Sequence, residues 1–286
     1  MENNDNCCLL ILNYNDSDTV IKLLKTTEAY SVFKYVLIVD NASTDDSYRV
    51  LKAYENDKIK LIRSDINGGY GAGNNMGIKY AKNTLGCEYV LLSNPDVYFD
   101  ESLVKDFTEV LKNEPAAALV SAVQLDINGV PIEDKAWKIP SSLEYAVMNT
   151  KLSNFNDGWH YKDKELTEPL CEVECLPGAL LFFDADKFIE AGGYDENMFL
   201  FCEETVIAVR LKQKGYKTYL LADKTYKHEH SVSINKSINS EIKKLKMIFD
   251  NRRYVMKKYL NSPLYLRILA KFIQSMKILK MEITQR

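Results

Sequence analysis

Short apolar runs alternate with amphipathic stretches along much of the chain, and several of the apolar runs end in polar residues. The runs have the length and composition of buried strands, whereas the stretches between them repeat apolar positions with helical spacing. This alternation predicts βαβ units, and therefore an α/β fold around a mostly parallel, buried sheet. We expect strands at 7–12, 35–39, 59–63, 89–93, 117–125, 180–183 and 218–222, and helices at 19–29, 48–56, 74–82, 102–112 and 203–214.

Two segments depart from this alternation. Residues 126–172 lose regular periodicity and collect Gly, Pro, Trp and Asn, which predicts a long functional excursion from the sheet. From Glu241 onward the pattern is helical, and apolar residues form a single stripe on one face. The stripe consists of Leu264, Ile268, Phe272, Met276 and Leu279. We therefore predict an α/β domain over 1–235 and a C-terminal helical extension over 236–286.

The composition is that of an ordinary soluble globular protein, since 46% of the 286 residues are hydrophobic and 27% are charged. The formal net charge of −3 provides no global basic field, so nucleic acid is not an expected partner. The charge is uneven, however, because residues 241–286 carry twelve basic and three acidic side chains, a local charge of +9. This basic extension could lie on an anionic membrane, or it could pack on the domain or on a second subunit of a homodimer.

The six cysteines are scattered along the chain, and the first residues lack the basic region of a secretory signal. Cys171 and Cys175 have no second pair to complete a zinc site, so we expect no zinc. No uncharged apolar stretch approaches the roughly 20 residues that span a bilayer. We expect a cytoplasmic protein with free thiols, whose contact with a membrane, if any, is peripheral and at the inner face.

Polar residues follow four of the predicted strands: Asn13 and Asn15, Asp40 and Asn41, the run 67–73, and 94–96. Ligands of open α/β sheets bind outside the carboxyl ends of the strands, so these residues predict a site for a polar, phosphorylated ligand. The glycines of the run follow the third strand and lack the G-x-G-x-x-G spacing of a dinucleotide site. A dehydrogenase is therefore disfavoured.

Each candidate residue has a functional and a structural interpretation. Asp40 can accept a hydrogen bond from an imide or a ribose hydroxyl, or it can cap a helix. Asp96 in Asn94-Pro95-Asp96 can hold a divalent cation, or it can belong to a plain turn. Glu203 and Glu204 begin a helix, where acids are favoured in any case, but one of them could be a general base. His228 follows a strand, and it can be either a metal ligand or a surface histidine.

Seven motifs occur in a fixed order along the chain. They are I-L-N-Y-N (11–15), I-V-D-N-A-S-T-D (38–45), N-G-G-Y-G-A-G-N-N-M-G (67–77), L-S-N-P-D-V (92–97), P-G-A-L (177–180), G-G-Y-D-E (192–196) and F-C-E-E (201–204). Together they resemble the family 2 glycosyltransferases, which have a GT-A fold and transfer sugars from nucleotide donors with inversion. The resemblance spans residues 7–235 and is greatest to bacterial rhamnosyl- and galactofuranosyl-transferase-like proteins with an N-P-D motif.

The resemblance implies a donor site for a UDP- or dTDP-sugar. Asp40 would bind the pyrimidine base, Asn13 and Asn15 would line the same pocket, and Asn67 and Asn74 would lie near the nucleotide or the sugar.

The resemblance also implies a metal ion and a catalytic base. Asp96, the last residue of the DXD-like motif that begins at Asn94, would hold Mg²⁺ or Mn²⁺ on the diphosphate, and His228 would complete the metal shell. Glu204 would be the base, although the family usually has Asp there. Because Val206 stands where many relatives carry a second acid, the base remains open between Glu203 and Glu204.

We therefore expect an inverting transfer by a single in-line displacement, onto a glycan or lipid-linked acceptor, in bacterial cell-surface polysaccharide synthesis. Aromatic residues of the irregular stretch could stack on sugar rings or belong to the core. They are Trp137, Tyr145, Phe155 and Trp159. Two alternatives are an inactive sugar-nucleotide or glycan-binding module and a sugar nucleotidyltransferase. The second would carry a basic phosphate loop after the first strand, where residues 13–18 contain neither Lys nor Arg.

Overall fold

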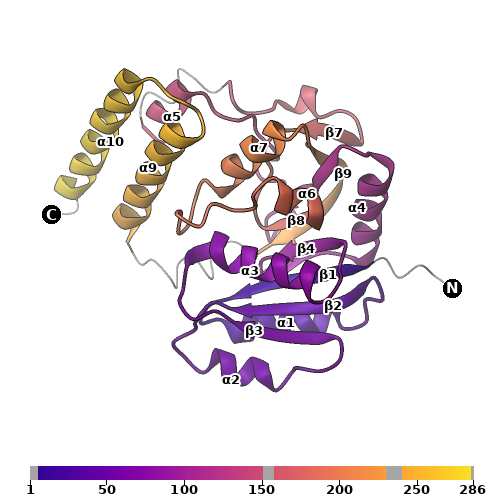
Figure 1. The fold of residues 1–286 in the computed structure, drawn as a ribbon. Coiled ribbons are helices and arrows are strands. Elements are labelled where there is room, and N and C mark those ends of the chain that lie inside the picture. The colour runs from indigo at the N-terminus through magenta and orange to yellow at the C-terminus, as the bar shows by residue number, and fades with distance from the viewer. Residues whose placement is uncertain (1–5, 151–157, 230–239, 285–286) are drawn as a thin grey trace.

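In the computed structural model, residues 6–150, 158–229 and 240–284 are described. Nine strands of these residues form one mixed sheet through the centre of the molecule. The strand order is β3-β2-β1-β4-β8-β6-β9-β5, and β7 pairs with β9 (Figure 1). The strands are β1 (Cys7–Asn13), β2 (Phe33–Asp40), β3 (Ile59–Arg63), β4 (Tyr89–Ser93), β5 (Val97–Tyr98), β6 (Ala117–Leu125), β7 (Leu170–Val173), β8 (Leu180–Asp184) and β9 (Lys217–His228).

The first four strands of that order are parallel, with Leu10 of β1 beside Leu37 of β2 and Leu92 of β4. β8 then enters antiparallel between β4 and β6. Because β1, β2 and β4 run in the same direction, their carboxyl ends meet at one edge of the sheet. The predicted mostly parallel α/β fold is confirmed.

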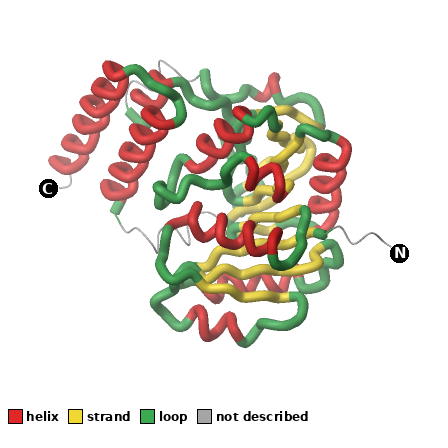
Figure 2. The backbone as a smooth tube through the Cα atoms, viewed as in Figure 1, coloured by secondary structure: helices red, strands yellow, loops and turns green. Residues whose placement is uncertain are grey.

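Helices cover both faces of the sheet, as Figure 2 shows in red around the yellow strands. The helical segments are α1 (Ser17–Thr27), α2 (Ser47–Lys52), α3 (Gly69–Asn83), α4 (Glu101–Asn113), α5 (Ser142–Val147), the 3₁₀ turn η2 (Asp163–Glu165), α6 (Ala185–Glu190), α7 (Glu203–Gln213), α9 (Glu241–Lys258) and α10 (Leu264–Thr284). Alternate residues of β1 belong to two separate cores, as the two-residue repeat of a strand requires. Leu9 packs in the core shared with α1, α2 and α4, and Leu10 in the core shared with α3, α6 and α7.

The helix expected over 74–82 begins earlier, at Gly69, so most of the predicted glycine-rich turn is helical. Close packing explains the glycines: a Cβ on Gly71 would lie 2.9 Å from the Cβ of Tyr194, and a Cβ on Gly77 would lie 2.4 Å from a methyl group of Leu10. The absence of side chains at these positions lets α3 lie directly on β1 and on the loop that precedes α7.

Two further expectations about elements are corrected. The last strand of the sheet runs to His228 rather than stopping at residue 222, because β9 continues along β6 and then pairs with β5, where His228 is opposite Val97. The excursion over 126–172 also contains regular structure, namely α5, the turn η2 and strand β7. The strands expected at 59–63, 89–93 and 117–125 have the predicted bounds.

The C-terminal helices α9 and α10 lie together at one side of the molecule and pack with α5 (Figure 1). Their contact forms a small third core that includes Tyr145, Met256 and Ala270. The predicted boundary at 235/236 falls outside the described residues and stays a prediction. Among the helices that the structure describes, none has the length and apolar character needed to cross a bilayer.

Candidate functional site

A cavity of about 530 Å³ lies at the carboxyl edge of β1, β2 and β4. Its wall is formed by residues that follow these strands, by the loop before β8, by the first residues of α7 and by the end of β9. Six of the candidates for the catalytic, nucleotide and metal sites line it: Asn67, Asn94, Asp96, Glu203, Glu204 and His228. The fold thus collects acidic, amide and imidazole groups from distant parts of the chain around one space.

Asp96 and His228 form a buried pair in the cavity wall. Nε2 of His228 lies 3.1 Å from Oδ1 of Asp96, and the two residues are 7% and 4% exposed, respectively. The pairing of β5 with β9 sets this geometry, since Val97 is opposite His228 and the backbone N–H of Glu229 donates to the carbonyl of Asp96 at 3.0 Å. His228 is therefore part of the site and not a surface histidine.

A carboxylate oxygen is a ligand that Mg²⁺ and Mn²⁺ prefer, and an imidazole nitrogen is a common ligand of transition-metal ions. The described residues contain no group of three or more His, Cys, Asp or Glu side chains placed to hold a metal ion. A hard divalent cation needs only one or two protein ligands when phosphate oxygens and water supply the rest. The pair therefore fits a cation that is shared with a phosphorylated ligand.

Glu203 and Glu204 enter the cavity at the start of α7. A turn with positive φ at Phe201 (77°) and Cys202 (72°) directs the chain into the helix and places both carboxyl groups in the wall. Glu203 is 5% exposed, and burial, together with the charge of Glu204, raises its pKa to about 8. Burial likewise raises the pKa of Glu204. Carboxyl groups with raised pKa values are suited to accept a proton near neutral pH.

The loop before β8 packs against Glu204. A Cβ built on Gly178 would lie 3.1 Å from Oε1 of Glu204, so only glycine leaves the carboxyl group its present room. The hydroxyl of Tyr70 donates to the carbonyl of Gly178 at 2.8 Å and fixes that loop to α3. Neither Tyr70 nor Gly178 was given a role from the sequence, although both lie in the quoted motifs.

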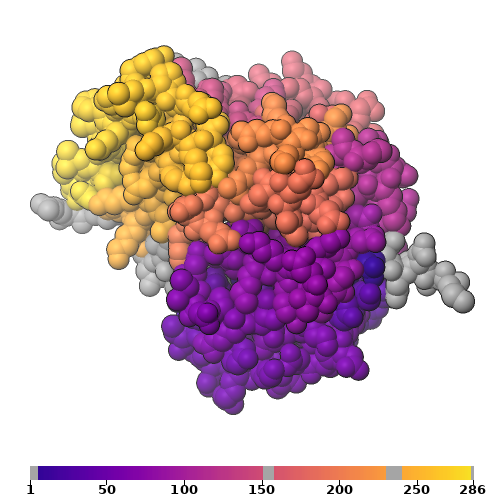
Figure 3. Space-filling model, in the orientation of Figure 1, coloured from indigo at the N-terminus to yellow at the C-terminus, as the bar shows by residue number. Residues whose placement is uncertain are grey.

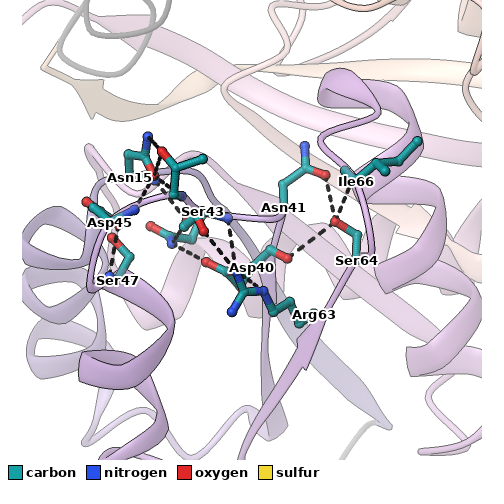
Figure 4. Close-up of polar contacts among 11 residues, drawn as sticks. Asn15, Asp40, Asn41, Ser43, Asp45, Ser47, Arg63, Ser64 and Ile66 are labelled. Carbon is teal, nitrogen blue, oxygen red and sulfur yellow. Dashed lines mark hydrogen bonds and ion pairs between the residues drawn. The ribbon is translucent and has the colours of Figure 1, made fainter.

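Asp40 is not among the residues that line the cavity. Figure 4 shows its polar contacts with its neighbours. Its buried carboxylate accepts hydrogen bonds from Nδ2 of Asn13 at 2.9 Å and from the backbone N–H of Ser43 at 3.1 Å. Nε of Arg63 lies 3.3 Å from the same carboxylate. These contacts hold the turn after β2, and the neighbouring Asn41 reaches the cavity.

Three of the other nucleotide-site candidates, Asn13, Asn15 and Asn74, are also outside the cavity wall, whereas Asn67 and Asn94 line it. Asn15 binds the next loop, where its Oδ1 accepts from the backbone N–H of Thr44 at 2.8 Å. Asn74 is fully buried in α3, and its amide has no hydrogen-bond partner among the described residues. Asp40 does not cap α2, which begins at Ser47 directly after Asp46.

The structure adds residues next to those that the sequence singled out. Tyr14 and Asp16 line the cavity, and both lie in the polar turn that follows the first strand. Asn41, which the sequence places beside Asp40 at the end of the second strand, lines the cavity as well. Among the aromatic residues considered for sugar stacking, Trp137 lines the cavity, whereas Tyr145 is in the third core. Trp159 packs against that core, and Phe155 lies outside the described residues.

The chain is similar to known proteins in sequence and in fold. The family described as "Glycosyl transferase family 2" matches residues 8–189. A low-salt glycan biosynthesis hexosyltransferase, Agl10 of Haloferax volcanii, is 23% identical over 211 residues, which are 74% of this chain and 63% of that protein. An N-acetylglucosaminyl-diphospho-decaprenol L-rhamnosyltransferase of Mycobacterium tuberculosis is 25% identical over 193 residues, 63% of this chain and 62% of that protein. The chain thus spans less than two thirds of the length of these relatives.

Among solved structures, GalNAc-T7 in a crystal structure with UDP, GalNAc and Mn²⁺ superposes with a TM-score of 0.64 at 14% sequence identity. The match covers 80% of this chain and 45% of that one. At this level of identity, the likeness establishes a shared GT-A fold.

Proposed function

Because the chain belongs to glycosyl transferase family 2, we propose that it transfers a sugar from a nucleoside-diphosphate donor to an acceptor hydroxyl with inversion. The observation that carries this proposal is the shared cavity of the Asp96–His228 pair and the Glu203–Glu204 carboxyl groups. A charge clamp and a base must face the same substrate in such a reaction, and the fact that the pair and the two carboxyl groups line one space supports these roles.

The donor is proposed to be a UDP- or dTDP-sugar whose diphosphate lies near Asn94 and Asp96. Asp96 and His228 would hold Mg²⁺ or Mn²⁺, whose charge would stabilise the departing diphosphate. Asp40 would act through the turn that it holds, which presents Asn41 to the cavity.

Asn13 supports the same turn through its hydrogen bond to Asp40. Asn15, Asn67 and Asn74 are proposed to shape the donor side of the site, with Asn67 in the cavity wall.

Glu204 is the proposed base. It would take the proton of the acceptor hydroxyl as that oxygen attacks the anomeric carbon and the bond to the diphosphate breaks. Its raised pKa supports this role, since a carboxylate that has lost part of its hydration is a stronger base than a fully hydrated one. Glu203, with a pKa of about 8, would keep its proton at neutral pH and so limit the negative charge beside Glu204.

The acceptor is proposed to be a glycan or a lipid-linked sugar. The Mycobacterium tuberculosis relative is named for a diphospho-decaprenol substrate, and the Haloferax volcanii relative for glycan biosynthesis. Trp137 offers an aromatic surface in the cavity wall on which an acceptor sugar could stack. Such a reaction would serve cell-surface polysaccharide synthesis.

A thermal-shift panel of UDP-, dTDP-, GDP- and CDP-sugars with and without Mn²⁺ tests the donor site, because any ligand of the native state stabilises it. We expect Mn²⁺-dependent stabilisation by UDP- or dTDP-sugars in the wild type and its loss in Asp96→Asn. Stabilisation by GDP-sugars alone would contradict the pyrimidine assignment. The absence of any shift in a folded sample would contradict the proposal as a whole.

A further inference from the structure

The last helix, α10, exposes a row of large apolar side chains to solvent. Phe272 is 65% exposed and Ile268 61% exposed, although residues of this kind are normally buried. We call this surface the apolar face of α10. It consists of Leu264, Tyr265, Ile268, Leu269, Phe272, Met276, Leu279 and Ile283.

The orientation of this face is set by contacts on the opposite side of the helix. Ala270 and Gln274 are buried against α5 and α9. Oε1 of Gln274 accepts from Arg253 of α9 at 2.6 Å, and its Nε2 donates to the carbonyl of Tyr145 in α5 at 3.3 Å. The apolar face therefore points away from the protein. Figure 1 shows α10 as the outer helix of the C-terminal pair, and Figure 3 shows it at the periphery of the molecule.

Basic residues border the apolar face. At about 100° per residue, its eight side chains fall within an arc of about 140°, with Lys271 and Lys280 each about 20° beyond one of its edges. Both lysines are exposed. Residues 241–286 as a whole carry a charge of +9, in a chain whose net charge is −3.

The other helix of the pair, α9, is attached directly to the cavity wall. Nδ2 of Asn251 donates to the carbonyl of Leu200 at 2.6 Å and to that of Phe201 at 3.1 Å, and both of these residues line the cavity. Tyr254 and Lys258 bind the buried carboxylate of Asp195, a few residues before the same loop. The pair of helices α9 and α10 is thus attached to the cavity wall through α9.

We propose that the apolar face of α10 docks on the surface of an anionic lipid bilayer, with the helix lying in the plane of the interface. The face would enter the boundary between headgroups and acyl chains, and the lysines at its edges would meet the acidic headgroups. Charge favours this partner over a second copy of the chain, because a dimer through this face would bring two extensions of +9 together. The inference rests on this surface alone and does not depend on the proposed transferase reaction.

Flotation of the full-length protein with vesicles tests the proposal without any activity assay. We expect binding to vesicles of phosphatidylcholine with phosphatidylglycerol, much weaker binding to phosphatidylcholine alone, and a decrease at high salt. The double variant Phe272→Asp/Leu279→Asp should lose binding by about tenfold or more, since burying either apolar side chain contributes that much. Lys271→Glu/Lys280→Glu should lose the preference for anionic vesicles.

A matched control is available in the Asp126–Pro131 turn. Ile127 and Val130 are 53% and 58% exposed, so Ile127→Asp/Val130→Asp makes the same change in charge and apolarity away from α10. It should bind vesicles as the wild type does. Equal binding by the two Asp double variants would overturn the proposal. A second outcome would also overturn the proposal: the wild type does not float with vesicles, light scattering shows that it is a dimer, and the variant Phe272→Asp/Leu279→Asp is a monomer.

Discussion

The buried carboxyl group of Glu203 should make the protein less stable as the pH rises through the neutral range. Burial raises the pKa of Glu203 from its ordinary value of 4.5 to about 8, so between these pH values the folded state holds a proton that the unfolded chain has released. Linkage then requires the free energy of unfolding to fall as the pH increases from 4.5 to 8. At pH 7 the difference of 2.5 pH units from the unfolded pKa corresponds to about 3 kcal/mol.

Glu203→Gln replaces the carboxyl group with an uncharged amide of similar shape and removes this cost. The variant should therefore be more stable than the wild type by about 3 kcal/mol at pH 7, and the gain should shrink towards zero as the pH falls to about 4.5. Chemical denaturation over this pH range measures both effects. Glu133→Gln is the matched control, because Glu133 is exposed, and its unfolding should follow the wild type at every pH.

The reasoning would be refuted by a Glu203→Gln variant that is no more stable than the wild type at pH 7, or by a gain that does not depend on pH. Such a result would mean that Glu203 is ionised in the folded protein. A positive result would fit the pattern in which a functional site retains a group that costs stability.

Two further predictions concern groups that position the site. Gly178→Ala should lower kcat for nucleoside-diphosphate release roughly ten- to a hundredfold, because its Cβ would lie 3.1 Å from Oε1 of Glu204. The control Gly158→Ala, whose Cβ would lie 3.6 Å from Oε1 of Glu144, should leave this rate unchanged. Equal rates in the two variants would count against Glu204 as the base. Asp195→Asn should destabilise the protein by about 2 kcal/mol at neutral pH, because the buried carboxylate loses its charge opposite Lys258. The contact with Lys258 holds the pKa of Asp195 below its ordinary value, so the difference in urea midpoint between the wild type and Asp195→Asn should narrow as the pH falls below about 4. A difference that does not depend on pH would contradict this explanation.

Much of the fold could be predicted because the strands are short, apolar and bounded by polar residues. The strand at 59–63, for example, is preceded and followed by polar residues, and its bounds are as predicted. The start of α3 was mislocated because a run of glycines indicates a turn when read locally, whereas here Gly71 and Gly77 permit close contact with distant elements. Such contacts are invisible in the pattern of a single segment.

The site could be predicted where it depends on strand ends and not where it depends on side-chain direction. Asp96 and Glu204 line the cavity, whereas Asp40, at an equally marked strand end, does not line it and binds Arg63. The periodicity of α10 likewise defined an apolar stripe, but only packing determines which side of the helix is covered. Gln274 lies on the covered side, and Phe272 is exposed.

The most direct test of the account is nucleoside-diphosphate release from the donor that stabilises the protein, with Mn²⁺ present, in the wild type and in Glu204→Gln. The account predicts turnover by the wild type, loss of turnover in the variant, and unchanged donor-induced stabilisation in both. Normal turnover by Glu204→Gln would remove Glu204 as the base. A wild type that binds the donor but never releases nucleoside diphosphate, even with candidate glycan and lipid-linked acceptors, would contradict the proposed transfer and favour a binding module.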